Sequence, residues 1–322
     1  MNKQPVDWTK SLMHCSIIAF LMMDGKEKTP RQLWEDACNS RDEWKTKYAA
    51  LDERKKGMAT GTNMLKKIAA WEEKVAELAK NKDDEPLSQT AKSYLKKYYA
   101  YLKYGKWSAA LDKGNKYTNK GKLAEKDSIA LCSLLDNRSY SKNTHRLTNE
   151  YLTGEPDIIH IINDETDLYI IDVKTSWDIE TFMGCLGEDL TPLYWWQLQA
   201  YFAITGASSG EVSYCLVDTP ETILLQEKYY LAQRMNAAID VSTDPEYLAA
   251  ERDLINNMTF GDMPEKDRRI RFIVERDDEA IAKMYKRIEK AREYLAEVEK
   301  LHSIGTFNAK SIENQSVIEE AA

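Results

Sequence analysis

Hydrophobic residues recur every three to four positions through most of residues 1–110, and this spacing predicts helices. The clearest helix start is Thr29-Pro30-Arg31-Gln32, where Thr suits the N-cap, Pro the first helical position and Gln a capping box. The same spacing predicts helices over 64–78 and 88–104, and a polar run between them indicates a loop. We therefore expect residues 1–85 to form a helical N-terminal region.

Further along the chain, runs of β-branched residues predict strands. Two of these runs, 157–163 and 168–175, are joined by polar residues that predict a hairpin turn. The predicted order is a helix at 123–135, strands at 146–152, 157–163 and 168–175, a helix at 193–205 and a strand at 211–218. A helix, a three-stranded meander, a helix and a strand indicate an α/β fold with a mixed sheet.

The C-terminal part of the chain is less uniform. A stripe of apolar residues predicts an amphipathic helix over 278–301, whereas 220–276 gives little signal. Residues 303–322 contain few large apolar side chains, so we expect a flexible tail there. The core then spans 86–302. The pattern leaves open whether the N-terminal helices form an arm, a partner surface or a contact in a homo-oligomer. It also leaves open whether the 278–301 helix packs on the core or on another subunit.

Composition narrows the class of protein. The 322 residues are 43 % hydrophobic and 30 % charged, as in soluble globular proteins, and no apolar run is long enough to span a membrane. The five cysteines lie far apart without a CxxC pair, which favours reduced thiols and argues against an iron–sulfur cluster. Phosphate-binding glycine motifs and GxSxG are absent, so no nucleotide cofactor is expected. We expect a cytoplasmic protein without a membrane partner.

The stretch with the clearest chemistry is the predicted hairpin. Asp172 and Lys174 end an apolar strand and lie on one face of it, because strand side chains alternate. Asp157 begins the partner strand, so it should lie beside Asp172. Two adjacent carboxylates repel unless a cation lies between them, and oxygen ligands favour Mg²⁺ or Mn²⁺. His160 faces the opposite side from Asp157, and we interpret it as a structural residue.

A third pair of polar residues follows on the next helix. Gln197 and Tyr201 are four positions apart and share a helix face, where they could contact phosphate oxygens or hold the active-site lysine. Alternatively, Tyr201 faces the core and Gln197 is its solvated neighbour. In order, Gly154-x-x-Asp157, Asp172-x-Lys174 and Gln197-x-x-x-Tyr201 resemble the PD-(D/E)xK nuclease superfamily. They are most similar to its RecB-like and lambda-exonuclease-like branch, in which a QxxxY helix follows the catalytic strand. The resemblance covers about residues 118–220.

The resemblance implies a restriction-endonuclease-like core and a set of site residues. Members of the family place a Glu on the helix before the sheet, and here Glu125 is the candidate, with Asp127 in reserve. It implies that Lys174 orients the attacking water and that Gln197 and Tyr201 position the strand being cut. The implied ligands of one or two Mg²⁺ or Mn²⁺ ions are Glu125, Asp157, Asp172 and the backbone carbonyl of Val173.

The function that the resemblance implies is metal-dependent hydrolysis of DNA phosphodiester bonds to give 5′-phosphate products. We expect an exonuclease of phage-type recombination, replication or repair, acting in the host cytoplasm if it is phage-encoded. Its partners would be DNA, as linear duplex ends or single strands, and a single-strand annealing or binding protein. An endonuclease of the same fold is one alternative. A non-catalytic DNA-binding or recombination-partner protein is another.

Net charge first argues against a nucleic-acid partner. The chain has 45 Lys and Arg against 53 Asp and Glu, a net charge of −8. The charge is uneven, however, because ten lysines and only two acidic residues lie between Lys92 and Lys126, interleaved with tyrosines. Lysines with exposed aromatic rings suit a nucleic-acid backbone and its bases. We expect Lys96, Lys97, Lys103 and Lys106 to contact DNA, although the tyrosines could instead belong to the core.

Overall fold

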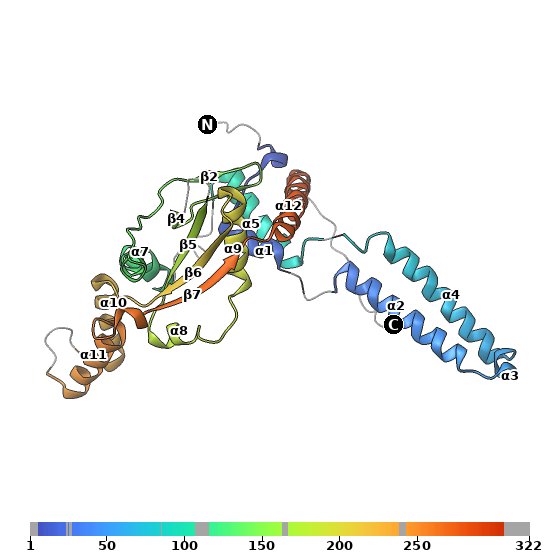
Figure 1. The fold of residues 1–322 in the computed structure, drawn as a ribbon, viewed down its shortest axis with the longest axis horizontal. Helices are drawn as coiled ribbons and strands as arrows, with labels where there is room; N and C mark the ends of the chain where they lie inside the picture. Colours follow the sequence, from blue (N-terminus) through green and yellow to red (C-terminus); the bar gives the residue numbers. More distant parts are fainter. Residues whose placement is uncertain are drawn as a thin grey trace.

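The computed structural model describes residues 6–23, 25, 28–84, 86–106, 116–162, 167–237 and 243–305. These residues form a mixed α/β core from which a helical arm projects (Figure 1). The arm consists of α2 (Pro30–Ala49) and α4 (Ala59–Ala79), which pack against each other and are joined by the short α3 (Glu53–Lys56). Thr29 caps α2 with the capping box that the sequence predicts, and this confirms the predicted helix start.

The main sheet has four strands in the order β4 (Ile158–Ile161), β5 (Leu168–Thr175), β6 (Ser209–Cys215) and β7 (Arg269–Glu275). β5 pairs antiparallel with β4 and parallel with β6, and β7 runs antiparallel to β6. The pairing of β4 with β5 confirms the predicted hairpin strands. The sheet is therefore mixed, as expected from the order of elements along the chain.

The predicted strand over 146–152 is wrong in its length and its partners. It is divided into β2 (Leu147–Thr148) and β3 (Leu152–Gly154), which form a separate small sheet with β1 (Met13–His14). The physical reason is Asn149, whose side-chain oxygen accepts hydrogen bonds from the backbone N–H groups of Tyr151 and Leu152 at 2.9 and 2.8 Å. This turn interrupts the strand, so 146–152 is not the first strand of a meander in the main sheet.

Helices cover both faces of the main sheet. On one face, Ile170 of β5 packs in a core cluster with Leu198 and Phe202 of α9 (Pro192–Thr205). On the other face, the adjacent Ile171 packs with residues of α7 (Lys116–Leu135). The alternation of neighbouring side chains between two cores explains the continuous apolar run of β5. The amphipathic helix expected near the C-terminus is α12 (Asp278–Ile304), and its apolar stripe packs in the α9 cluster.

The beginning of the chain belongs to the core. The short helices η1 (Trp8–Lys10), η2 (Cys15–Ile17) and α1 (Ile18–Met22) pack with α9 and α12, as does α5 (Gln89–Tyr104) with α12. The division of the chain at residue 85 stays a prediction, but the structure separates residues 8–22 from the arm. The predicted tail over 303–322 lies outside the described residues from residue 306 onward.

The remaining helices lie near the ends of β5 and β6. They are α8 (Ile179–Met183), α10 (Glu221–Met235) and α11 (Pro245–Met258), with the single turn η3 (Glu265–Asp267) before β7. Trp177, just after β5, packs with Ile223 of α10 and Met258 of α11. Across the residues described, none of the helices combines the length and hydropathy that a bilayer span requires.

Candidate active site

Asp172 and Lys174 lie on the same face of β5, as the strand period predicts. Asp172 is 1 % exposed, and its Oδ2 lies 2.6 Å from Lys174 Nζ. The Lys174 ammonium is therefore the partner of Asp172 Oδ2, which has no further hydrogen-bond donor among the described residues. The Lys174 ammonium also lies 4.6 Å from the centre of the Tyr194 ring of α9. This site is therefore a buried ion pair on the side of the sheet that α9 covers.

Asp157 is held against the same strand. It immediately precedes β4, whose Ile158 pairs with Ile171 of β5. Its Oδ2 accepts a hydrogen bond of 2.8 Å from the backbone N–H of Val173, the residue between Asp172 and Lys174. The structure thus brings Asp157, Asp172 and Lys174 together at one point of the sheet.

The pKa values of Asp157 and Lys174 both reflect burial and the closeness of the two carboxylates. Burial raises the pKa of Asp157 to about 8, and the neighbouring Asp172 carboxylate contributes to the rise, against the opposing effects of Lys174 and the Val173 N–H. Burial by itself lowers the pKa of Lys174, but Asp172 and Asp157 outweigh it and raise that pKa above its ordinary value. One lysine therefore compensates two carboxylates incompletely.

This arrangement fits a divalent cation. Asp172 Oδ2 is buried with Lys174 as its one ionic partner among the described residues, and a second positive charge beside the two carboxylates would favour the ionised form of Asp157. Both carboxylates offer oxygen ligands, which suit Mg²⁺ or Mn²⁺. Within the described residues, no group of three or more Asp, Glu, His or Cys side chains is arranged so that it could hold a metal ion. The residues present would therefore hold the ion through two carboxylates, with its other ligands still to be supplied.

The predicted third carboxylate, Glu125, lies on α7, and its partner there is a lysine. Its Oε2 forms an ion pair with Lys142, a residue that the sequence did not single out. Glu125 is nevertheless close enough to Asp157 to contribute to the raised pKa of that carboxyl. The reserve candidate, Asp127, is exposed. The metal-ligand roles of Glu125 and of the Val173 carbonyl stay predictions.

Gln197 and Tyr201 of α9 contact the loop that leads to Asp157. Gln197 donates a hydrogen bond of 2.9 Å to the Tyr201 hydroxyl, which in turn donates to the Glu155 carbonyl at 3.3 Å. Both side chains are buried. Burial raises the pKa of Tyr201 far above its ordinary range, with a further contribution from Asp172. These contacts hold the loop in place, and a direct role in positioning DNA stays a prediction.

Gly154, the last residue of β3, is required by close packing where the loop to Asp157 begins. A Cβ atom at this position would lie 2.6 Å from Cys15 Sγ and 3.0 Å from Cε1 of Tyr201. The glycine of the Gly154-x-x-Asp157 motif therefore lets the loop approach the ring of Tyr201. The motif identifies the glycine, but no pattern in the sequence points to Cys15, which lies far away in the chain.

The predicted DNA-contacting lysines of α5 and the residues that follow it are not equivalent. Lys96, Lys97 and Lys106 are exposed. Lys103 instead forms an ion pair of 2.6 Å with Glu299 of α12. The interleaved tyrosines also divide, because Tyr98 and Tyr99 are buried in the core, whereas Tyr101, Tyr104 and Tyr117 are exposed. The prediction that the tyrosines of this segment stack on bases is therefore wrong for the two buried rings. Trp107 and Lys113 of the same segment lie outside the described residues.

His160 lies away from the carboxylates, in agreement with its interpretation as a structural residue. Its Nε2 lies 2.8 Å from the Arg138 guanidinium, and its ring packs edge-on against Tyr140. Burial lowers the pKa of His160, and Arg138 lowers it further.

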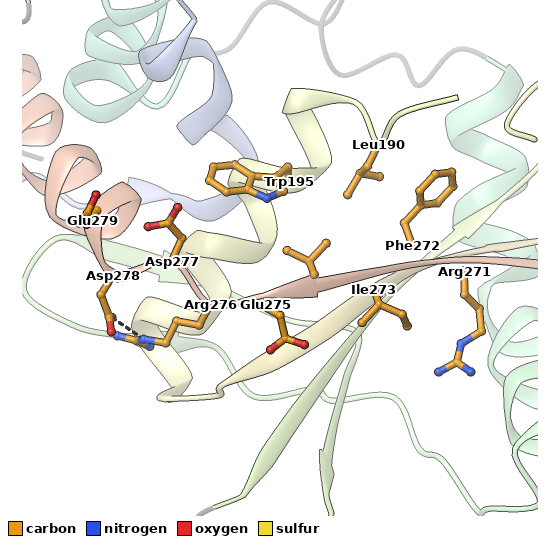
Figure 2. A pocket seen from close by; sticks show the side chains of 11 residues that line it. Leu190, Trp195, Arg271, Phe272, Ile273, Glu275, Arg276, Asp277, Asp278 and Glu279 are labelled. Carbon is orange, nitrogen blue, oxygen red and sulfur yellow. Dashed lines mark hydrogen bonds and ion pairs between the residues drawn. The ribbon is translucent and has the colours of Figure 1, made fainter. Parts of the chain in front are cut away.

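Two of the hollows lined by described residues lie outside this site. One, of about 820 Å³, follows β7 and is lined by residues such as Trp195, Phe272 and Arg276, the last paired with Asp278 (Figure 2). The other, of about 870 Å³, lies between the base of the arm, the start of α5 and α12. Neither is lined by Asp157, Asp172 or Lys174, so we place the candidate active site at the carboxylates rather than in these hollows.

Comparisons with known proteins support the fold. No family sequence model matches the chain, and no curated protein matches it in sequence. The structure is similar to that of a phage-related exonuclease from Haemophilus somnus 129PT, with a TM-score of 0.55 and 21 % identity over 92 % of this chain and 97 % of that one. An alkaline exonuclease from Laribacter hongkongensis matches 67 % of this chain and 86 % of its own, with a TM-score of 0.42 and 16 % identity. The first likeness confirms the predicted α/β fold class.

Proposed function

We propose that the protein is a metal-dependent DNA exonuclease that hydrolyses phosphodiester bonds and leaves 5′-phosphate products. The observation that carries this proposal is the convergence of Asp157, Asp172 and Lys174 at one point of the sheet. The fold shared with a phage-related exonuclease supports it, as does the order of the three sequence motifs that resemble the PD-(D/E)xK superfamily.

Asp157 and Asp172 would hold one or two Mg²⁺ or Mn²⁺ ions, with Glu125 and the Val173 carbonyl as further ligands. A bound divalent ion lowers the pKa of a water molecule and offsets charge that develops on the phosphate. The hydrogen bond from the Val173 N–H fixes one oxygen of Asp157, so the carboxylate keeps one orientation. This fixed geometry reduces the reorganisation that the reaction requires.

Lys174 would act as a donor and not as a base. Its pKa is raised, because Asp172 and Asp157 outweigh the effect of burial, so the ammonium is protonated at neutral pH. A compact cation at this position can hold a water molecule through its lone pair and stabilise the negative charge on a phosphate oxygen. The Tyr194 ring limits where the ammonium can move.

The buried pair Gln197 and Tyr201 would act on the reaction through the loop of Asp157. The Tyr201 hydroxyl supports the Glu155 carbonyl, two residues before Asp157, and Gln197 orients that hydroxyl. We also propose that the exposed Lys96, Lys97 and Lys106 contact the DNA backbone, and that phage-type recombination, replication or repair is the setting. A single-strand annealing or binding protein is the partner proposed there.

One degradation assay tests the function and separates the exonuclease from an endonuclease. The purified protein is incubated with an end-labelled linear duplex, a linear single strand and a closed circle, with Mg²⁺ or with EDTA. An exonuclease degrades linear DNA in Mg²⁺ only and leaves the circle intact, because it needs an end. Cleavage of the circle would indicate an endonuclease. Binding of DNA with no degradation under any condition would reject the nuclease function.

A further inference from the structure

Lys120 is a buried cation that the proposed reaction does not use. It lies in the first half of α7 and is 0 % exposed. Its Nζ lies 5.3 Å from the centre of the Phe260 ring and 6.0 Å from that of the Trp177 ring. The hydrogen bond that it makes is a 2.7 Å contact from Nζ to the backbone carbonyl of Trp177. In the part of the chain that the structure describes, no carboxylate lies within ion-pair distance of this ammonium.

A lysine in this environment is costly for folding. Burial lowers the pKa of Lys120 to about 8, although Asp178 and Asp218 favour the charged form from a greater distance. A charge that is buried without an ionic partner destabilises a protein, and apolar residues of similar volume often replace buried charges without loss of stability. A methionine would fill the same space between the aromatic rings. The lysine is therefore better explained by what it holds than by a contribution to stability.

The group that it holds lies just beyond the catalytic strand. Trp177 is three residues after Lys174 and two after Thr175, the last residue of β5. A second contact joins α7 to the end of β5 itself, because the hydroxyls of Ser128 of α7 and Thr175 of β5 lie 2.9 Å apart. Glu125 lies between these two contacts on α7, five residues after Lys120 and three before Ser128. The helix is thus attached to the end of β5 on both sides of Glu125, the residue proposed above as a further metal ligand.

We propose that Lys120 is a positioning residue, which sets the place of α7 along β5 and thereby the place of Glu125 relative to the end of the catalytic strand. The inference rests on the proposed nuclease function. Sliding of α7 by a fraction of a turn would move Glu125 away from Asp157 without disturbing Asp172 or Lys174. The hydrogen bond to a fixed backbone carbonyl prevents that movement, whereas apolar packing alone is less directional. Residues that orient a metal ligand affect metal affinity without touching the metal.

The test compares Lys120→Met with Lys116→Met. Lys116 lies one turn earlier on α7, is partly exposed and also contacts the Trp177 ring, at 4.6 Å, so it is a matched control. Binding of Mn²⁺ is measured by calorimetry on each folded protein without DNA, together with Tm. We expect Lys120→Met to weaken Mn²⁺ binding by about tenfold or more, with Tm unchanged or higher, and Lys116→Met to bind as the wild type does. Wild-type Mn²⁺ affinity in Lys120→Met would overturn the proposal.

A second measurement does not depend on whether a variant folds. Backbone hydrogen exchange of the wild-type protein is compared with and without Mn²⁺. Because coupling between two sites is reciprocal, bound Mn²⁺ should slow exchange in 120–128 of α7 as well as in β5. Slower exchange in β5 alone would overturn the proposal. A wild-type protein that neither binds Mn²⁺ nor degrades DNA would reject the proposed function itself, which is a different result from wild-type affinity in Lys120→Met.

Discussion

The carboxylate of Asp157, just before β4, accepts a hydrogen bond of 2.8 Å from the backbone N–H of Val173 in the neighbouring strand β5. This bond ties the start of β4 to the strand that carries Asp172 and Lys174. It holds the Asp157 carboxylate beside that of Asp172, where burial and their repulsion together raise the pKa of Asp157 to about 8. The proposed binding of a divalent ion follows from the closeness of these two carboxylates.

The first prediction concerns pH and metal. The folded protein binds a proton at Asp157 up to about pH 8, whereas the unfolded chain releases it near the ordinary aspartate pKa of 3.8. Between these values the folded state holds more protons, so the free energy of unfolding should fall as pH rises. In EDTA, Asp157→Asn should therefore raise Tm more at pH 8 than at pH 5. An equal effect at both pH values in thermal melts would contradict the assignment.

The same reasoning predicts the effect of a divalent ion. Mg²⁺ should raise the Tm of the wild-type protein at pH 8, because an ion that binds only the folded state stabilises it. The rise should disappear in Asp172→Asn, which lacks one of the two carboxylate ligands. A Tm that responds to Mg²⁺ equally in both proteins would place the ion elsewhere.

A second prediction follows from the packing at Gly154. Gly154→Ala brings a Cβ to 2.6 Å from Cys15 Sγ, so the loop or its neighbours must shift. Overpacking of this kind costs about 1–3 kcal/mol. Cys15→Ala should recover part of that cost in the double variant, because the sulfur is the nearest obstacle. Chemical denaturation of the four proteins measures the coupling, and strictly additive effects would argue against this explanation.

A third prediction separates the lysines of the α5 segment. The triple variant Lys96→Gln, Lys97→Gln, Lys106→Gln should bind DNA more weakly and with a shallower slope of log affinity against log salt. The slope should change by about 0.9 for each duplex phosphate that the lysines no longer neutralise. The control is Lys103→Gln, which should keep the wild-type salt slope, since Lys103 is already paired with Glu299. Binding titrations at several salt concentrations measure these slopes. A triple variant with the wild-type slope would show that these lysines do not contact DNA.

A fourth prediction concerns the buried charges of β6 and β7. Glu211 is 0 % exposed and accepts hydrogen bonds from Arg269, Arg271 and Tyr169. Glu211→Ala should cost about 3–5 kcal/mol, because Arg269 would keep only Asp136 as an acidic partner among the described residues. The exposed pair Lys45–Glu72 of the arm provides the comparison, and Glu72→Ala should cost less than about 1 kcal/mol. Similar costs for both substitutions in chemical denaturation would contradict this difference in burial.

The sequence is most informative where local pattern and site coincide. Asp157, Asp172 and Lys174 can be placed together because a hairpin fixes which strand ends are neighbours, and the strand period fixes which side chains share a face. The resemblance of the three motifs then supplies a chemical interpretation, and the fold class agrees with it.

Other features depend on contacts between distant parts of the chain. Strand β7 lies in the stretch over 220–276 that gives little signal as a whole, and the acceptor of its Arg269 and Arg271, Glu211, lies far away in the sequence on β6. Burial of Tyr98 and Tyr99 depends on the start of the chain, since Tyr98 donates to the Leu12 carbonyl and Tyr99 stacks on Trp8. No local pattern indicates these partners.

The most direct test of the central claim is the release of nucleotides from an end-labelled linear duplex in Mg²⁺ by the wild type, Lys174→Met and Asp172→Asn. DNA binding by each protein is measured in parallel in Ca²⁺, to show that the substrate site is intact. Both variants should bind linear DNA nearly as the wild type does and fall at least about a thousandfold in rate. Lys174→Met removes a cation at the reacting phosphate, and Asp172→Asn removes a ligand of the ion that would offset the charge there. Nucleotide release by either variant at the wild-type rate would contradict the account.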